Sequence, residues 1–129
     1  MLFNTRKDRT TGTGRLGEGM ALRHLQERGY EILATNYRKR FGEVDIVARW
    51  RGTIVFVEVK TRHSRRYGVP QEAVDERKQR QLARIAQDYL AAHHLENAPA
   101  RFDVTAGTLD REDQPARSDH IDNAFELSE

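Results

Sequence analysis

The sequence predicts an α/β protein in which a mixed β-sheet packs against two helices. Two segments repeat apolar residues at helical spacing and five have the composition and alternation of strands, in the order α-β-β-β-α-β-β. The chain of 129 residues is long enough for one hydrophobic core and too short for two well-packed domains. We therefore expect a flexible basic arm over residues 1–12 and a single domain over residues 13–129.

The first helix and the first strand follow this arm. Four residues recur at the i, i+3, i+4 and i+7 spacing of one helical face: Glu18, Ala21, Leu22 and Leu25. Gly29 supplies a stop signal for this helix. The segment YEILATNYR, residues 30–38, is then predicted to be a strand.

The next two strands, EVDIVARW and TIVFVEVKT, form a hairpin joined through Arg51 and Gly52. A two-residue turn would place Asp45 directly across from Glu58. Because side chains alternate between faces, one face gathers only apolar residues: Val44, Ile46, Ala48, Val55, Val57 and Val59. The other face gathers most of the charge: Glu43, Asp45, Val47, Phe56, Glu58 and Lys60. This separation favours the register, since a shift of one residue would place Asp45 opposite an apolar core residue.

The second half of the sequence predicts a basic loop, a helix and two more strands. The loop RHSRRYGVPQEA spans residues 62–73. The helix should begin after the N-cap Asp75 and run to about His94, with a short apolar stripe: Leu82, Ile85, Ala86 and Tyr89. Three segments complete the chain: a strand over residues 100–109, an acidic loop over residues 110–119 and a weaker strand over residues 120–127.

The facing carboxylates of Asp45 and Glu58 need compensation, because like charges on opposed strands destabilise the pair and raise the pKa of both groups. A structural answer is that Lys60 pairs with Glu43 or Glu58 while Asp45 is solvated at a strand end. A functional answer is that Asp45, Glu58 and the carbonyl of Val59 bind Mg²⁺ or Mn²⁺, which activates a water to attack phosphorus. Lys60 would then orient that water and stabilise charge on the phosphate.

Charge is distributed unevenly along the chain. Residues 1–84 hold 19 Lys and Arg against 10 Asp and Glu, whereas residues 85–129 hold 3 against 10. Such asymmetry favours a basic surface that binds phosphates. The candidate nucleic-acid contacts are Arg62, Arg65, Arg66, Arg77, Lys78, Arg80 and Arg84. The alternative is that these residues form a solvated loop and helix face. No residue pattern here indicates contacts with base edges, so any specificity would be for the shape of the nucleic acid.

Several protein classes are excluded. The chain has no cysteine, so a disulfide framework, a zinc ribbon and a thiol nucleophile are ruled out. The five histidines lack the spacing of a zinc site. No apolar segment resembles a signal peptide or a membrane span, and we therefore expect a soluble cytoplasmic protein without membrane contact.

The motifs of the hairpin resemble those of the PD-(D/E)XK nuclease superfamily, which has the restriction-endonuclease-like fold. GEVD ends at Asp45, and EVK begins 13 residues later at Glu58. The nearest likeness is the YraN-like family of small bacterial proteins, and it covers most of the chain through GRLGEGMA, NYR, VFVEVKTR, RFDV and HIDNAF. The resemblance implies that Asp45 and Glu58 are metal ligands and Lys60 the catalytic lysine. Val44 stands where the superfamily name has a proline.

The resemblance also implies a role for Glu18, as the additional helix-borne acid of relatives such as archaeal Holliday-junction resolvases. The sequence supports this independently, because Glu18 shares the stripe of Ala21 and Leu25 and should point inward. The alternative is an acidic first-turn residue favoured by the helix dipole.

Together these features predict a metal-dependent nuclease that hydrolyses phosphodiester bonds in DNA, more readily than in RNA, with branched or recombination intermediates among the candidate substrates. Pairing of two copies into a homodimer is left open. One rival is a nucleic-acid-binding protein that has the nuclease fold without activity. A second is a protein-interaction module that docks a partner through its acidic C-terminal half.

Overall fold

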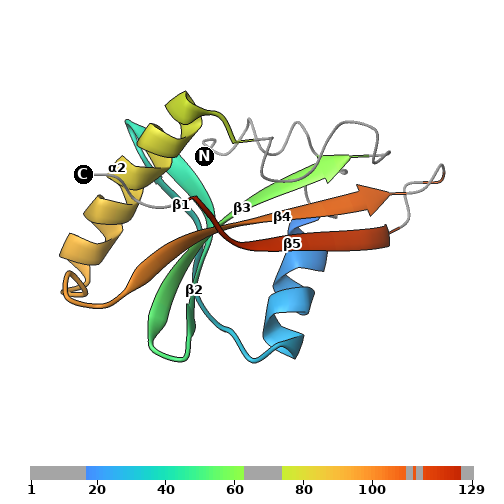
Figure 1. The fold of residues 1–129 in the computed structure, drawn as a ribbon, viewed down its shortest axis with the longest axis horizontal. Helices are drawn as coiled ribbons and strands as arrows, with labels where there is room; N and C mark the ends of the chain where they lie inside the picture. Colours follow the sequence, from blue (N-terminus) through green and yellow to red (C-terminus); the bar gives the residue numbers. More distant parts are fainter. Residues whose placement is uncertain (1–16, 63–73, 110–111, 113–114, 126–129) are drawn as a thin grey trace.

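The computed structural model describes residues 17–62, 74–109, 112 and 115–125, and its strands form one sheet in the order β1-β2-β3-β4-β5 (Figure 1). The strands are β1 (Glu31–Lys39), β2 (Gly42–Trp50), β3 (Thr53–Arg62), β4 (Ala100–Leu109) and β5 (Pro115–Phe125). The predicted arm and residues 63–73 of the predicted basic loop lie outside the described residues. The predicted α/β class, with a mixed sheet and two helices, is confirmed.

The sheet is mixed because one connection crosses over. β1, β2 and β3 follow one another as antiparallel neighbours, and β4 and β5 are likewise antiparallel. β3 and β4 run parallel and are joined through the helix α2 (Glu76–Ala92). A parallel pair needs such a crossover, whereas antiparallel neighbours need only a tight turn.

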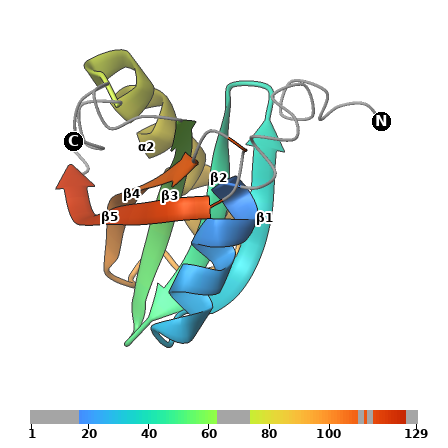
Figure 2. The same ribbon diagram turned by 90° about the vertical axis from the view of Figure 1, so that its right-hand side faces the viewer.

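The two helices cover opposite faces of the sheet, as Figure 2 shows with the blue helix of residues 17–27 in front and α2 behind. Alternate residues of the central strands belong to two core clusters. The cluster under α2 includes Val47, Ile54, Phe56, Leu82, Ile85 and Phe102. The cluster under residues 17–27 includes Ala21, Leu25, Ile46, Ala48, Val55 and Val57. Neither of these helices is long and apolar enough to cross a membrane.

The helix α2 follows the prediction closely. The Asp75 side chain caps it by accepting a hydrogen bond from the Lys78 amide at 2.9 Å. The predicted stripe is buried, with Leu90 added to it. The helix ends at Ala92, two residues before the predicted end, and His94 has a positive φ of 57°.

The register predicted for the β2–β3 hairpin is confirmed over five pairs, from Trp50–Thr53 to Ile46–Val57. Arg51 and Gly52 both have positive φ, of 52° and 84°. Positive φ at both central residues characterises the type I′ turn, whose twist matches that of the flanking strands.

The final strand begins earlier than predicted. β5 starts at Pro115, inside the predicted acidic loop of residues 110–119, and pairs along most of β4. Polar segments can form strands at a sheet edge, because an edge strand has one neighbour and needs no continuous apolar face. Proline fits the first position of such a strand, where no ladder donor is required.

Gly17, the first described residue of helix 17–27, lies in tight contact with β3. A Cβ added to Gly17 would lie 1.7 Å from Oγ1 of Thr61, whereas one added to Gly19 would meet nothing within 4 Å. We therefore expect Gly17→Ala to lower the free energy of unfolding by about 1–3 kcal/mol through overpacking. The matched control Gly19→Ala should raise it by about 0.5–1 kcal/mol, since alanine favours the helix. Urea unfolding would check both values, and equal effects of the two substitutions would contradict this packing.

Candidate active site

The four residues Asp45, Glu58, Val59 and Lys60 line one cavity of about 670 Å³. This cavity lies beyond the last β2–β3 ladder pair, on the side away from the hairpin turn. Its other lining residues come from β1, the β1–β2 turn and α2: Arg38, Lys39, Arg40, Gly42, Glu43, Lys78 and Gln81. The structure thus brings together every residue predicted from the hairpin to bind metal or act on the phosphate.

Asp45 does not face Glu58 across a regular ladder, as the hairpin register alone predicted. The described β2–β3 pairs end at Ile46–Val57, and Oδ2 of Asp45 accepts a hydrogen bond from the Val59 amide at 2.8 Å. The side-chain carboxylate therefore takes the place of a main-chain acceptor. The two strands separate here, and the cavity begins where they separate.

The same irregularity corrects the predicted position of Val44. It was expected on the face of Ile46, but it packs in the cluster under α2 together with Val47. The neighbouring strand is also irregular here, since Asn36 has a positive φ of 53°. The period of two is therefore broken at Asp45, and the face assignment fails for the residue beyond it.

Two lysines neutralise Glu58. Its Oε2 lies 3.6 Å from Nζ of Lys60 and 3.6 Å from Nζ of Lys78, and only 7% of the Glu58 side chain is exposed. The structural alternative for the hairpin charges is therefore half right, because Lys60 does pair with Glu58. Its other half is wrong, because Asp45 is 4% exposed and is not solvated at a strand end.

Glu43 adds a third carboxylate to the wall of this cavity. Its Oε1 lies 3.9 Å from Nε of Arg38, while its Oε2 is buried and accepts no hydrogen bond from any described residue. A buried carboxylate oxygen without a donor is costly unless water or a cation fills the space beside it. With the oxygens of Asp45 and Glu58 nearby, the donor set is all oxygen and suits a hard divalent cation.

Glu18 lies near these residues without lining the cavity. It is partly buried on helix 17–27, and its Oε2 accepts a hydrogen bond from Nδ2 of Asn36 at 3.1 Å. Asn36 lies between the ladder pairs Thr35–Ile46 and Tyr37–Val44, which makes it the β1 neighbour of Asp45. Glu18 therefore hydrogen-bonds a β1 residue that neighbours Asp45 and is not among the described residues that line the cavity.

The predicted nucleic-acid contacts on α2 line a second cavity of about 570 Å³. Arg77, Lys78, Arg80 and Arg84 are all among its lining residues, and it shares Lys60, Lys78 and Gln81 with the first cavity. Arg65 and Arg66 lie outside the described residues, as does the side chain of Arg62, whose backbone belongs to β3.

Basic residues at the end of β1, which were not predicted as contacts, also line the first cavity. Arg38, Lys39 and Arg40 lie at and just after the end of β1 and line the first cavity, to which α2 contributes Lys78. These residues belong to the run YRKR, residues 37–40, of which only the first two were assigned, as the end of the predicted strand 30–38. The short turn between β1 and β2 brings it beside GEVD, and cations therefore flank the carboxylates from β1 as well as from α2.

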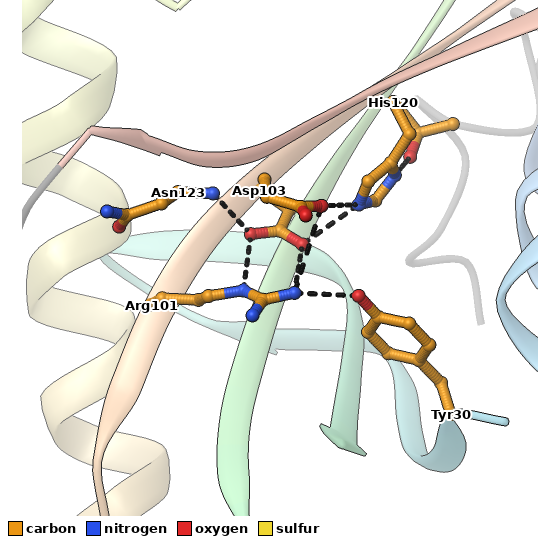
Figure 3. Close-up of polar contacts among 7 residues, drawn as sticks. Tyr30, Arg101, Asp103, His120 and Asn123 are labelled. Carbon is orange, nitrogen blue, oxygen red and sulfur yellow. Dashed lines mark hydrogen bonds and ion pairs between the residues drawn. The ribbon is translucent and has the colours of Figure 1, made fainter. Parts of the chain in front are cut away.

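A separate polar network lies on β4 and β5, as Figure 3 shows. Asp103, which is 1% exposed, accepts hydrogen bonds from Arg101 at 3.0 and 3.2 Å, from Nε2 of His120 at 2.9 Å and from the Asn123 amide at 2.8 Å. Arg101 also donates to the Tyr30 hydroxyl at 2.6 Å. Burial alone would raise the pKa of Asp103, but these donors outweigh it and hold the pKa below its usual range.

This network could hold a metal by geometry, but its charge is already balanced. Ligand atoms of Asp103, His120 and Asp122 lie within 4.8 Å of one another. The guanidinium of Arg101 binds both oxygens of Asp103 and lies 3.8 Å from Asp122, where a metal would have to compete with it. Arg101 and Asp103 belong to the motif RFDV, and His120 and Asp122 to HIDNAF. The sequence signal that could have identified the network is Asp103, an acid between apolar residues of a predicted strand.

Comparison with known proteins places the chain in a family. Residues 17–106 match the model of the uncharacterised protein family UPF0102. A UPF0102 protein of Syntrophus aciditrophicus is 52% identical over 116 residues, with 90% of each chain covered. Another from Pelobacter propionicus is 48% identical over 128 residues, covering 97% of this chain and 90% of the relative. The chain therefore belongs to the UPF0102 family.

Proposed function

We propose that this protein is a metal-dependent nuclease with a restriction-endonuclease-like fold, of the PD-(D/E)XK superfamily, which hydrolyses phosphodiester bonds in DNA. One observation carries the proposal: Asp45, Glu58, Val59 and Lys60 line a single cavity bounded by cations. Carboxylates that bind a metal and cations that bind phosphates have to lie side by side in such an enzyme.

The carboxylates of Asp45 and Glu58 and the carbonyl of Val59 would hold Mg²⁺ or Mn²⁺. Glu43 lines the same cavity, and its buried Oε2, which no described residue hydrogen-bonds, supports the fit of a cation. When bound, the metal would lower the pKa of a water and counter the charge that develops on the phosphate. Asp45 is fixed for this role by its bond to the Val59 amide, which holds the carboxylate and the carbonyl-bearing residue together.

Lys60 would act on the water and the phosphate. Its side chain is 39% exposed while its Glu58 partner is buried, so its ammonium can leave that carboxylate and turn into the cavity. A cation there stabilises the negative charge of the transition state. Lys78 would remain beside Glu58, so that the buried carboxylate keeps a cation when Lys60 moves away.

A second candidate function is DNA binding without cleavage. The observation that favours it is the pair of ammonium groups on Glu58, because they neutralise that carboxylate without a metal. The basic residues of β1 and α2 would then bind phosphates, and the carboxylates would be structural.

A substrate panel separates the two candidates. Purified protein would be incubated with labelled linear, nicked, flapped and four-way-junction DNA, and with RNA, in Mg²⁺, Mn²⁺ or EDTA. We expect metal-dependent cleavage of at least one DNA substrate and none in EDTA. Binding that is lost at high salt, with no cleavage of any substrate, would favour the second candidate. Cleavage that persists in EDTA would contradict the metal mechanism.

Pairing of two copies, which the sequence leaves open, and the expected cytoplasmic location belong to the same proposal. Cutting both strands of a branched molecule needs two sites, which two copies of this chain would supply. Light scattering of the protein with and without junction DNA would measure its mass. A single copy per junction, together with cleavage of one strand only, would remove the homodimer from the proposal.

A further inference from the structure

The second cavity contains an aromatic side chain beside its cations. Phe41 lies in the β1–β2 turn and lines this cavity together with Arg77, Arg80 and Arg84 of α2. The guanidinium carbon of Arg84 is 4.7 Å from the centroid of the Phe41 ring. A planar cation therefore lies over an aromatic ring at the edge of the proposed site.

The turn is held against α2 by close packing. A Cβ on Gly42 would lie 2.9 Å from Cγ of Gln81, so a larger residue at this position would require the Gln81 side chain to shift. Phe41 is partly buried and also packs against the core cluster under α2. Arg84 is exposed. The partly buried ring thus covers one face of the guanidinium and leaves the arginine at the surface of the cavity.

A guanidinium supported in this way is a surface on which a nucleobase can stack. Proteins that bind single strands combine a basic groove for the backbone with aromatic or arginine planes for the bases. A base within a duplex already has neighbours on both faces and cannot use such a plane. Arg77 and Arg80 supply charge for the backbone phosphates on either side of an unpaired base.

We propose that the second cavity binds an unpaired nucleotide whose base stacks on the Arg84–Phe41 pair. This assignment rests on the proposed nuclease function for its biological meaning, because the two cavities share Lys60, Lys78 and Gln81. It places single-stranded DNA next to the cleaved phosphate. Flaps, gaps and open junctions therefore bind better than continuous duplex.

The test measures binding without cleavage and is therefore independent of the nuclease proposal. Two labelled single strands of about 12 nucleotides, one with normal bases and one with abasic sites, would be titrated in EDTA by fluorescence anisotropy. We expect the base-bearing strand to bind about tenfold more tightly to the wild type. Equal affinities for the two strands would overturn the assignment, whether or not the protein cuts DNA.

Matched variants test whether the base stacks on the guanidinium plane of Arg84. Arg84→Lys keeps the charge but loses the flat surface, and Phe41→Leu removes the supporting ring, so each should reduce the preference to about threefold or less. Arg80→Lys is the control in the same cavity, and it should keep the full preference. Melting curves confirm that the variants fold. A preference that survives Arg84→Lys, or that Arg80→Lys removes equally, would place the base elsewhere.

Discussion

Replacing Lys60 by alanine should lower the rate of DNA cleavage at saturating substrate by at least about 100-fold, because in the proposed mechanism the lysine acts on the water and the phosphate in the transition state. The fold should be unaffected, since the Lys60 side chain is 39% exposed. Initial rates on a labelled substrate in Mg²⁺ would measure the loss, and thermal melting would verify the fold. Cleavage that survives the substitution would show that the activity comes from a contaminant or from another site.

Lys78 offers a matched control for this experiment. Its ammonium lies 3.6 Å from the same Glu58 oxygen as that of Lys60, but it comes from α2. If Lys60 acts in the transition state and Lys78 only binds substrate and balances charge, Lys78→Ala should raise KM more than it lowers kcat. Equal losses of kcat in the two variants would mean that the lysines act only through the charge of Glu58.

Substitutions that remove the charge of Asp45 or Glu58 should abolish metal-dependent cleavage without abolishing DNA binding. Asp45→Asn keeps an oxygen that accepts from the Val59 amide but removes the charge that a metal needs. Glu58→Gln likewise keeps the shape of the side chain. We expect both to remove Mg²⁺-dependent cleavage while DNA binding in EDTA stays within about twofold, because the proposed phosphate contacts come from the basic residues at the end of β1 and on α2.

The largest loss of stability should follow from Asp103→Ala. This substitution leaves the partly buried Arg101 without the carboxylate of Asp103 and removes an acceptor of His120 and of the Asn123 amide. Breaking a buried ion pair in this way costs about 3–5 kcal/mol. Asp103→Asn, which retains an acceptor, should cost about 1–3 kcal/mol. Urea unfolding would measure both.

Asp122 provides the control for that loss. It approaches the same partners, at 3.3 Å from His120 and 3.8 Å from Arg101, but 58% of its side chain is exposed. Asp122→Asn should therefore change the free energy of unfolding by no more than about 1 kcal/mol. A cost for Asp122→Asn as large as that for Asp103→Asn would contradict the assignment of stability to the buried carboxylate.

The low pKa of Asp103 gives its contribution a defined pH dependence. A carboxyl whose pKa is lower in the folded state than its usual 3.8 stabilises the fold above that value and loses this effect as pH falls through the lower folded pKa. The stability difference between wild type and Asp103→Asn should thus be constant near neutral pH and shrink below about pH 4. A difference that grows on acidification would contradict the lowered pKa.

The hairpin could be predicted because its register and its chemistry depend on neighbouring residues. The alternation of apolar and charged residues fixes the β2–β3 pairing around Arg51 and Gly52, and the structure has that pairing. The break at Asp45 could not be predicted, because strand alternation assumes that every amide bonds to a main-chain oxygen. A buried carboxylate that takes the Val59 amide violates this assumption.

The network of Asp103 escaped prediction for a related reason. Asp103 lies at an irregularity of the β4–β5 pairing and accepts from the Asn123 amide, as Asp45 accepts from the Val59 amide. The members of this network come from β4, β5 and the residue before β1, and Tyr30 joins it only through Arg101, 71 residues later in the sequence. In both strands an acid stands among apolar residues, and an acid in such a position has to be paired, whether for stability or for chemistry.

The most direct test of the proposed site is the position of a bound metal. Crystals soaked in Mn²⁺ would be measured for anomalous scattering. We predict a peak about 2.1 Å from carboxylate oxygens of Asp45 and Glu58, with the Val59 carbonyl as a further ligand. A peak at Asp103, His120 and Asp122 instead, or none between Asp45 and Glu58, would contradict the proposed metal site.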